Sequence, residues 1–401
     1  MTDCIIPEGY KKTSLGVIPK EWEAVRIHEI CTLVNGRAYK QNELLSEGKY
    51  KILRVGNFFT NDSWYFSDLE LEANKYACKG DLLYAWSASF GPRFWTEEKV
   101  IYHYHIWKIC DLKGVDKQYL YFFLDYDASL LQNAIQGGTM HHITKNDMEK
   151  RFIPLPPMEE QQNIAKVLNT WDKAIEKQTQ LIEKLELRKK GLMQQLLTGK
   201  KRLPGFGGEW KNIAIKDFAI EVSLKNNRNE NWEVLSCTKY DGLVPSLQYF
   251  GRQVFSKDIT QYKIVPQYCF AYATNHIEEG SIGYQSIYKN SLISPMYTVF
   301  KTDSNMIDDI FLYKLLKSHR AIYLYNVMME GSIDRRGGLR WDNFSTIKFL
   351  LPDIKEQSAI ADILVSCDNE ILLAKQKLNK FRQQKKGLMQ VLLTGKKRVN
   401  I

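Results

Sequence analysis

The sequence predicts an α+β protein in which two globular domains are separated by two long antiparallel coiled-coil helices, related by a pseudo-twofold internal repeat. Three observations predict this arrangement. Residues 189–202 read KKGLMQQLLTGKKR, and residues 385–398 read KKGLMQVLLTGKKR, 196 positions further on. An apolar stripe with alternating spacings of four and three residues runs up to both copies, which is the coiled-coil pattern. The remaining sequence mixes short β-rich stretches with helical ones.

The repeat extends backwards from the two near-identical segments at the same offset. Leu155-Pro156 aligns with Leu351-Pro352, and Glu160-Gln161 aligns with Glu356-Gln357. A match this long indicates a tandem duplication, which organises the whole chain. We therefore expect a first globular domain at 1–157, a first long helix at 158–202, a second globular domain at 203–352 and a second long helix at 353–401.

Each repeated segment is expected to form one helix of about 36 residues, or about 54 Å at 1.5 Å per residue. Pro156, Pro157 and Pro352 can stand before such a helix but not inside it. Gly199 and Gly395 follow the stripes and supply natural C-terminal stops. The two helices therefore begin and end at equivalent places in the repeat.

The apolar stripe favours pairing of the two helices with each other. The alternative is a helix packed into an ordinary core, but both copies carry the stripe, and both are far longer than an average helix. Lys189 and Lys385 interrupt the stripe and are expected to reach solvent near opposite ends of the pair. The expected seam comprises Ile164, Leu168, Trp171, Ile175, Ile182 and Leu185 on the first helix, and Ile360, Leu364, Ile371, Leu378 and Phe381 on the second.

The globular segments differ strongly from each other but share landmarks. Trp22 and Trp210 stand near their beginnings, and Gly138-Thr139 and Gly331-Ser332 stand near their ends. A shared frame with diverged loops suits two domains that recognise different targets. Expected strands lie at 51–55, 81–85, 101–109, 268–273 and 296–301, and expected helices at 118–135 and 306–329.

Composition narrows the class of protein. The net charge of +10 and the pI near 9.0 favour polyanionic partners. No run of apolar residues is long enough to span a membrane, and no signal peptide stands at the N-terminus. The seven cysteines are scattered and form no C-x-x-C pair, so we expect neither a zinc site nor disulfides. This cysteine usage is typical of the reducing cytoplasm.

The helix beginnings and ends carry a resemblance. Both helices open on Leu-Pro-x-x-x-Glu-Gln, at residues 155–161 and 351–357, and both close on Gly-Leu-Met-Gln-x-Leu-Leu-Thr-Gly, at 191–199 and 387–395. With the variable–conserved–variable–conserved order, these motifs resemble the specificity subunits of type I restriction-modification enzymes. Weaker matches are residues 80–83, 86–91 and 280–283. The resemblance covers the whole chain.

The resemblance implies a division of labour. Each variable segment would be a target-recognition domain that reads one half of a split, asymmetric site in double-stranded DNA. The helices would fix the length of the unread spacer and carry two methyltransferase subunits, to which restriction subunits can be added. S-adenosylmethionine, ATP and Mg²⁺ would belong to those partners, so this chain is expected to hold no cofactor, no metal and no catalytic residue.

DNA contacts are expected from cationic, amide, hydroxyl and imidazole side chains of both variable segments, because such groups bind base edges and phosphates. For each residue the alternative is a solvated surface group or a structural ion pair. The basic helix ends at 189–202 and 385–398 have three interpretations: the helix dipole, DNA, or docking of a partner. The candidates are Arg37, Lys40, Arg54, Asn57, Ser87, Arg93, His141, His142 and Lys145 in the first segment, and Asn226, Asn227, Arg228, Arg252, Asn275, His276, Arg335, Arg336 and Arg340 in the second.

Two other classes of protein are alternatives. An enzyme acting alone is disfavoured, because the one Pro-Pro pair follows Leu155 and cannot form the Asn/Asp-Pro-Pro-aromatic loop of an amino-methyltransferase. Asp81 followed by Glu97-Glu98-Lys99 imitates a nuclease metal site, but so short a pattern is common by chance. A coiled-coil scaffold that does not read DNA explains the helices and leaves the two diverged domains unexplained.

Overall fold

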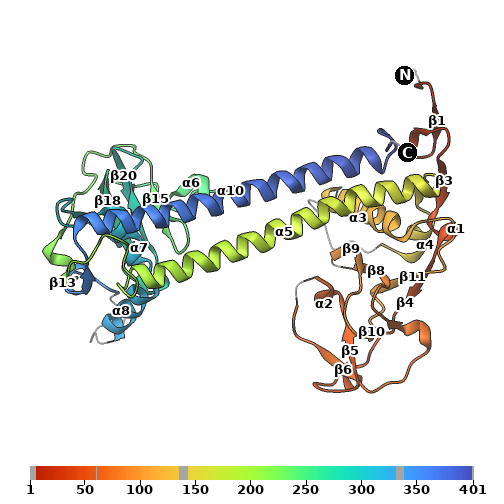
Figure 1. Ribbon diagram of the computed structural model, residues 1–401, viewed down its shortest axis with the longest axis horizontal. Coiled ribbons are helices and arrows are strands. Elements are labelled where there is room, and N and C mark those ends of the chain that lie inside the picture. The colour runs from red at the N-terminus through yellow and green to blue at the C-terminus, as the bar shows by residue number, and fades with distance from the viewer. Residues whose placement is uncertain (1–5, 60, 88, 135–142, 331–337, 400–401) are drawn as a thin grey trace. The chain divides into compact units, whose positions relative to one another are not determined.

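The computed structural model describes residues 6–59, 61–87, 89–134, 143–330 and 338–399. The chain divides into two compact units, each formed by one globular domain and half of each long helix (Figure 1). Unit 1 comprises residues 1–179 and 376–401, and unit 2 comprises residues 180–375. Among the described residues, no helix is both long and apolar enough to cross a membrane.

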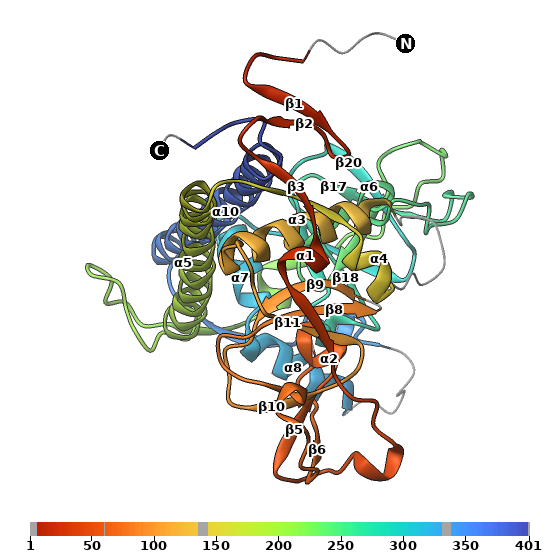
Figure 2. The ribbon, with the colours of Figure 1, turned by 90° about the vertical axis from the view of Figure 1, so that its right-hand side faces the viewer.

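Unit 1 is built around the antiparallel sheet β4-β11-β8-β9, with a second sheet of order β6-β5-β10-β7. Helix α3 packs against β9 (Figure 2). The elements of the globular part are β1 Tyr10–Thr13, β2 Gly16–Pro19, β3 Glu23–Arg26, α1 Ile27–Ile30, β4 Thr32–Asn35, β5 Tyr50–Leu53, α2 Val55–Phe59, β6 Tyr65–Ser67, β7 Tyr76–Ala77, β8 Leu82–Ser87, β9 Ser89–Phe94, β10 Val100–Tyr102, β11 Ile106–Cys110, α3 Lys117–Ala134, α4 Lys145–Glu149 and β12 Phe152–Leu155, with short 3-10 turns at Gln41–Glu43 and Ala73–Lys75.

Unit 2 repeats the central sheet of unit 1 in the same order, β14-β21-β18-β19, again fully antiparallel. In both units a strand before the sheet pairs with the strand that leads into a long helix, β3 with β12 and β13 with β22. The elements are β13 Lys211–Ala214, β14 Ala219–Glu221, β15 Leu235–Thr238, β16 Gly242–Pro245, α6 Ser246–Phe250, β17 Lys263–Pro266, β18 Cys269–Ala273, β19 Ile282–Gln285, β20 Asn290–Ile293, β21 Tyr297–Thr302, α7 Asp309–Leu316, α8 His319–Glu330, α9 Trp341–Phe344 and β22 Lys348–Leu351, with 3-10 turns at Ile215–Asp217 and Ile277–Glu279.

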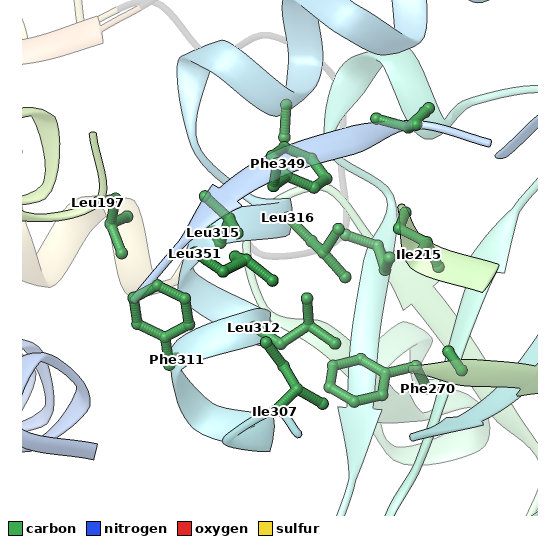
Figure 3. Close-up of a cluster of buried hydrophobic side chains, with 14 of the residues drawn as sticks. Leu197, Ile215, Phe270, Ile307, Phe311, Leu312, Leu315, Leu316, Phe349 and Leu351 are labelled. Atoms are coloured by element: carbon green, nitrogen blue, oxygen red, sulfur yellow. The ribbon is translucent and has the colours of Figure 1, made fainter. Parts of the chain in front are cut away.

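The core of unit 2 shows why these residues form these elements. Helix α7 buries Phe311, Leu312, Leu315 and Leu316, which recur at helical spacing and form one apolar face (Figure 3). That face meets Phe270 of the sheet together with other buried side chains of the cluster. Burial of each large side chain contributes about 1.5–3 kcal/mol. The other side chains labelled in the cluster are Leu197, Ile215, Ile307, Phe349 and Leu351.

Two sequence predictions of single elements are corrected. The helix expected at 306–329 is two helices, α7 and α8, because the chain leaves helical geometry at Lys317 and restarts after Ser318. The Ser318 hydroxyl accepts from the amide of Ala321, and the buried Tyr325 hydroxyl donates to the carbonyl of Leu316. The strand expected at 101–109 is likewise two strands, β10 and β11, in different sheets.

The long helices are α5, Met158–Leu196, and α10, Ile354–Leu392, each of 39 residues. They pack together and run antiparallel. In unit 1, the Trp171 and Phe381 rings meet edge to face with their centroids 5.7 Å apart. In unit 2, Glu186 of α5 pairs with Lys375 at 2.6 Å, and Arg188 pairs with Glu370. Residue numbers on α10 fall as those on α5 rise, which confirms the antiparallel pair.

The expected seam residues are divided between two environments. Ile164 and Leu168 lie fully buried in the core of unit 1, and Ile360 and Leu364 occupy the equivalent place in unit 2. The outer part of each stripe therefore packs into a globular core, and the remainder lies along the helix pair. The side chains of Ile182, Leu185, Ile371 and Leu378 are buried, and those of Trp171, Ile175 and Phe381 are half-buried.

The expectation that both lysines reach solvent is wrong for Lys385 and holds in part for Lys189, whose side chain is 28% exposed. Lys385 pairs with Asp172 at 2.6 Å and is only 13% exposed, whereas Lys189 pairs with Asp368. These two ion pairs are equivalent under the repeat. Opposite charges across the helix pair satisfy both lysines inside the stripe, so each interruption becomes a contact between α5 and α10.

A buried carboxylate stands at the start of each long helix. Glu160 is inaccessible to solvent; it accepts from Trp22 Nε1 at 2.9 Å and from Arg398 through two bonds of 2.6 and 2.8 Å. We call this set the unit 1 clasp. Burial of a carboxylate is expensive unless it is paired and hydrogen-bonded. Here the pairing joins the first turn of α5 to the segment that follows α10.

The unit 2 clasp repeats this geometry. Glu356, also inaccessible, accepts from Trp210 Nε1 at 3.1 Å and from Arg202 through two bonds of 2.7 Å each. The neighbouring Gln161 and Gln357 accept from the amides of Asp116 and Asp308 at 2.7 and 2.9 Å, just before α3 and α7. The Glu-Gln pair of the repeated motif thus fastens each long helix to its domain.

Replacement of the clasp arginine tests how much the stability of each unit depends on its clasp. Arg398→Ala leaves Glu160 buried without its charge partner, so we expect a loss of about 3–5 kcal/mol in the free energy of unfolding. Arg202→Ala should have the same effect through Glu356. Urea unfolding measures both, with the exposed neighbour Lys397→Ala as the control, expected within about 0.5 kcal/mol of wild type. A loss below about 1 kcal/mol in both arginine variants would contradict the role of the clasp.

Candidate nucleic-acid interface

The same end of the central sheet is presented in both units. In unit 1 the chain returns to the sheet at Ile143, whose amide donates to the carbonyl of Trp86 at the end of β8. In unit 2 it returns at Leu339, whose amide donates to the carbonyl of Thr274 just after β18, at 2.8 Å. β8 and β18 hold the same position in their sheets, and Ile143 and Leu339 are 196 residues apart. We call these two places the reading ends.

The reading end of unit 1 is aromatic. Trp86 stacks on Trp107 with centroids 5.7 Å apart and meets His105 edge to face at 4.9 Å. Tyr104, which is 37% exposed, lies against both His103 and His105. Such rings offer flat apolar surface with polar edges, which suits bases and sugars better than phosphates.

His103 is held neutral at this end of the sheet. Burial, and then the neighbouring His105 and Arg54, lower the pKa of His103 to about 4. Arg37 forms an isolated backbone β-bridge with His103, and its guanidinium lies over the ring of Tyr39. At neutral pH the imidazole therefore acts as a hydrogen-bonding group rather than as a cation.

The reading end of unit 2 is polar and hollowed. A groove with a volume of about 460 Å³ lies where β18 ends, β21 begins and α9 starts. Asn275 and Arg340, both predicted from the sequence, line it together with Thr274 and Lys263. Two candidates 65 positions apart in the chain are thereby brought to one site. The remaining lining residues are Glu221, Pro295, Met296, Tyr297, Thr298, Trp341 and Asp342.

Several candidates of unit 1 are engaged in structural contacts. Arg37 forms two bonds with Glu43, of 2.7 and 3.0 Å, and Asn57 closes its own loop by donating to the carbonyl of Ser63 at 2.7 Å. Arg93 donates to the carbonyl of Phe58. The other candidates that remain exposed on this unit are Lys40, Arg54, which lies over Tyr65, and Lys145, which is 3.5 Å from Glu149.

Two candidates are corrected, and four lie outside the described residues. Ser87 is 5% exposed and Asn226 is 1% exposed, so neither is available to DNA. The Asn226 side chain instead bonds the backbone of Glu230 at both its amide and its carbonyl, which clamps a turn. Asn227, Arg228, Arg252 and His276 are exposed on unit 2. The four outside the described residues are His141, His142, Arg335 and Arg336.

The nuclease-like pattern does not assemble. Asp81 accepts from the amide of Cys78 and pairs with Lys108, both at 2.8 Å, which is a turn role. The ammonium of Lys99 lies on the ring of Tyr76, 3.8 Å from its centroid. Within the described ranges, the one group of side chains close enough to hold a metal ion is His276, Glu278 and Glu279, and two of these three are exposed.

The basic residues at the helix ends make several different kinds of contact. Arg202 and Arg398 belong to the clasps and Lys189 and Lys385 to ion pairs, uses that the sequence did not suggest. In unit 2 a wide groove of about 990 Å³ runs between α5, α10 and the α7–α8 junction. We call it the cationic groove, because its charged lining comprises Lys189, Lys190, Lys200, Lys317, Arg320 and Lys375 against only Glu186 and Asp368.

Sequence reasoning missed the aromatic reading end. Trp86, His103 and Tyr104 were not among the candidates, because the predicted DNA contacts were mainly cations and amides. The run Tyr102-His103-Tyr104-His105 was the available signal, since it places four aromatic or imidazole side chains in succession where β10 leads into β11. Lys263 was missed because nothing in its local sequence places it beside Asn275.

Comparison with known proteins agrees with this architecture. The family model described as the type I restriction modification DNA specificity domain matches residues 19–187 and 208–383. The MjaVIII specificity subunit of a type I restriction enzyme from Methanocaldococcus jannaschii is 27% identical, over 98% of this chain and 96% of the relative. A second protein of that organism, the putative MjaX specificity subunit, is 26% identical over 98% of this chain and 97% of its own length.

Solved structures share the fold. The S subunit of a type I restriction-modification system from M. genitalium superposes with a TM-score of 0.55 at 16% identity, covering 93% of this chain and 96% of that one. A chain from a structure of type I R-M complex assembly gives a TM-score of 0.58 at 13% identity, covering 94% and 99%. At these identities the likeness concerns the fold alone.

The lowered pKa of His103 predicts a pH-dependent stability. Between pH 6.5 and about 4, the unfolded chain binds a proton at this imidazole that the folded chain does not bind. The contribution of the neutral imidazole is therefore fully present above pH 6.5 and is lost as the pH falls toward 4. Between pH 7 and pH 4.5, the free energy of unfolding should fall less in the His103→Asn variant than in wild type. Urea unfolding at the two pH values measures both losses. The exposed His276→Asn is the control, and equal losses in all three proteins would rule the prediction out.

Proposed function

This chain belongs to the family of type I restriction-modification DNA specificity proteins, and on that premise we propose that it reads a bipartite, asymmetric site in double-stranded DNA. Each globular domain reads one half-site at its reading end. The DNA of the cell is the target, so we place the protein in the cytoplasm.

One observation carries the proposal: two domains with the same sheet order present different chemistry at the same place. The reading end of unit 1 offers Trp86, His103 and Tyr104, and that of unit 2 offers Asn275 and Arg340. Different chemistry at equivalent surfaces of one frame is what recognition of two different sequences requires. A scaffold without DNA recognition gives no reason for it. The net charge of +10 supports a polyanionic ligand.

The long helices set the distance between the half-sites in this proposal. Each helix of 39 residues has a length of about 58 Å at 1.5 Å per residue. Two linked readers gain effective concentration only when their spacing matches that of their sites. A stiff pair of helices therefore selects DNA by spacer length as well as by sequence.

Catalysis belongs to partners in this proposal. Two methyltransferase subunits dock on the chain, restriction subunits join them, and S-adenosylmethionine, ATP and Mg²⁺ act in those subunits. The cationic groove supports a docking role, because Lys190, Lys200 and Arg320 extend its excess of positive charge beyond the ion pairs of Lys189 and Lys375. The repeat places lysines equivalent to Lys190 and Lys200 at Lys386 and Lys396 in unit 1.

Selection from a randomised duplex library tests the proposal directly. The full chain with its methyltransferase subunits should enrich two short, unlike sequences separated by an unread spacer of fixed length. Replacement of residues 211–351, from the start of β13 to the end of β22, by the same segment of a relative should change one half-site and leave the other unchanged, because both clasps stay outside the exchange.

Two outcomes decide against it. Enrichment of no sequence, with binding that only weakens as salt rises, would mark a scaffold or a non-specific binder. A change in both half-sites after the exchange would contradict one reader per unit. A variant that carries the relative's Arg202–Trp210 segment as well serves as the control for damage at the junction.

A further inference from the structure

We propose that the groove at the reading end of unit 2 reads a purine in the major groove of its half-site, with Arg340 directed to guanine or Asn275 to adenine. This inference rests on the proposed function and adds the chemistry of one contact. It concerns base edges, which specify sequence, rather than phosphates, which position the protein.

The groove holds its two readers in a fixed relation. The amide of Leu339 donates to the carbonyl of Thr274 at 2.8 Å, so the segment that carries Arg340 is tied to the residue before Asn275. Gly338, at φ +66°, passes so close that a Cβ there would lie 2.3 Å from Asn275 Oδ1. Only glycine fits this approach, and the packing limits the positions open to Asn275. Readers held by rigid elements give the geometric precision that base recognition needs.

The charge of the groove favours base edges. Its ionisable lining is balanced, with Lys263 and Arg340 against Glu221 and Asp342. Lys263 already donates to the carbonyl of Tyr297 at 2.7 Å, and none of the described side chains forms an ion pair with Arg340. A phosphate track needs an excess of positive charge, as the cationic groove of the same unit has. A balanced groove with both donors and acceptors matches the pattern that bases present.

The side chains offer the groups that purines require. The Arg340 guanidinium is exposed, and its two parallel donors fit O6 and N7 of guanine. The Asn275 amide offers one acceptor and one donor, which fit N6 and N7 of adenine. The Thr274 hydroxyl lies 3.4 Å from Asn275 Oδ1 but only 3.0 Å from the carbonyl of Met296. Because its single hydrogen is better placed on the carbonyl, the amide keeps both functions for a ligand.

Among the described residues, the pseudo-equivalent surface of unit 1 offers no such pair. Trp86 stands where unit 2 has Thr274, and its indole donates to the carbonyl of Tyr104 at 2.9 Å. The purine contact is therefore specific to the half-site of unit 2, and variants of Asn275 and Arg340 should leave the other half-site unaffected.

The test is selection from a randomised duplex library by the full chain with its methyltransferase subunits, followed by sequencing of the bound DNA. Arg340→Ala should lower the preference for guanine at one position of one half-site by about 10- to 100-fold, with every other position unchanged. Arg340→Lys should keep part of that preference, because lysine still bonds guanine but without the fork. Asn275→Asp should lose a preference for adenine at one position, since a carboxylate accepts from cytosine instead.

The control is Lys257→Ala, an exposed cation of the same unit that neither lines the groove nor stands among the predicted DNA contacts. It should leave every base preference unchanged. Melting temperatures establish that all variants are folded. The salt dependence of binding gives a second measurement, because loss of a base contact leaves its slope unchanged, whereas loss of a phosphate contact lowers it by about 1.

The outcomes separate this inference from the proposed function. Equal weakening for all sequences, with the base preferences kept and a lower salt slope, would show that Arg340 contacts phosphate and would overturn the purine contact alone. Unchanged selection by both Arg340→Ala and Asn275→Asp would also overturn it. If wild type itself enriches no sequence, the proposed function fails first.

Discussion

A buried carboxylate at the start of each long helix constrains the structure more than any other interaction. Glu160 and Glu356 are inaccessible to solvent, and each is satisfied by one tryptophan and one bidentate arginine. The arginine of each clasp follows the other long helix, so neither unit can complete its core with one copy of the repeat. In unit 1 the pairing joins residues 238 positions apart in sequence. Each long helix therefore depends on the segment after the other one to pair its buried glutamate.

This constraint leaves the reading ends free to vary. The clasps, the Glu-Gln hydrogen bonds and the β3–β12 and β13–β22 pairs all lie where the domains meet the helices. At the ends of β8 and β18, by contrast, the feature that the described residues of both units share is the backbone bond made by Ile143 or Leu339. Aromatic rings can therefore occupy one reading end and a polar groove the other, without loss of the common frame. The physical separation of support from recognition explains how one fold serves two different half-sites.

The sequence predicted those features that depend on periodicity and repetition. The offset of 196 residues, the two long helices and their antiparallel pairing follow from pattern alone, and the lengths differ from the prediction by only a few residues. What it did not predict depends on partners distant in the chain. The clasps need a tryptophan, a glutamate and an arginine from three separate segments. The ion pairs of Lys189 and Lys385 were not predicted, because their partners Asp368 and Asp172 lie on the other helix.

The candidate site illustrates the same limit. Asn226 and Asn275 are equivalent as sequence signals, yet one clamps a turn at 1% exposure and the other lines an open groove. Ser87 belongs to a strand whose register turns it inward. Residue type indicates which chemistry is possible, whereas burial decides whether DNA can reach it. The aromatic reading end was not predicted, because its function would come from shape and stacking rather than from charge.

The most direct test of the account is the spacer length selected after both helices are lengthened. Seven residues of helix-forming sequence are inserted between Thr179 and Gln180 and between Lys375 and Gln376, where the two units divide. The insertion adds about 10 Å to each helix, or about three base pairs of DNA. Selection from a randomised library should then return the two original half-sites with a spacer longer by about that amount. The same half-sites at the original spacing, bound as tightly as by wild type, would contradict the claim that the paired helices set the distance between two readers.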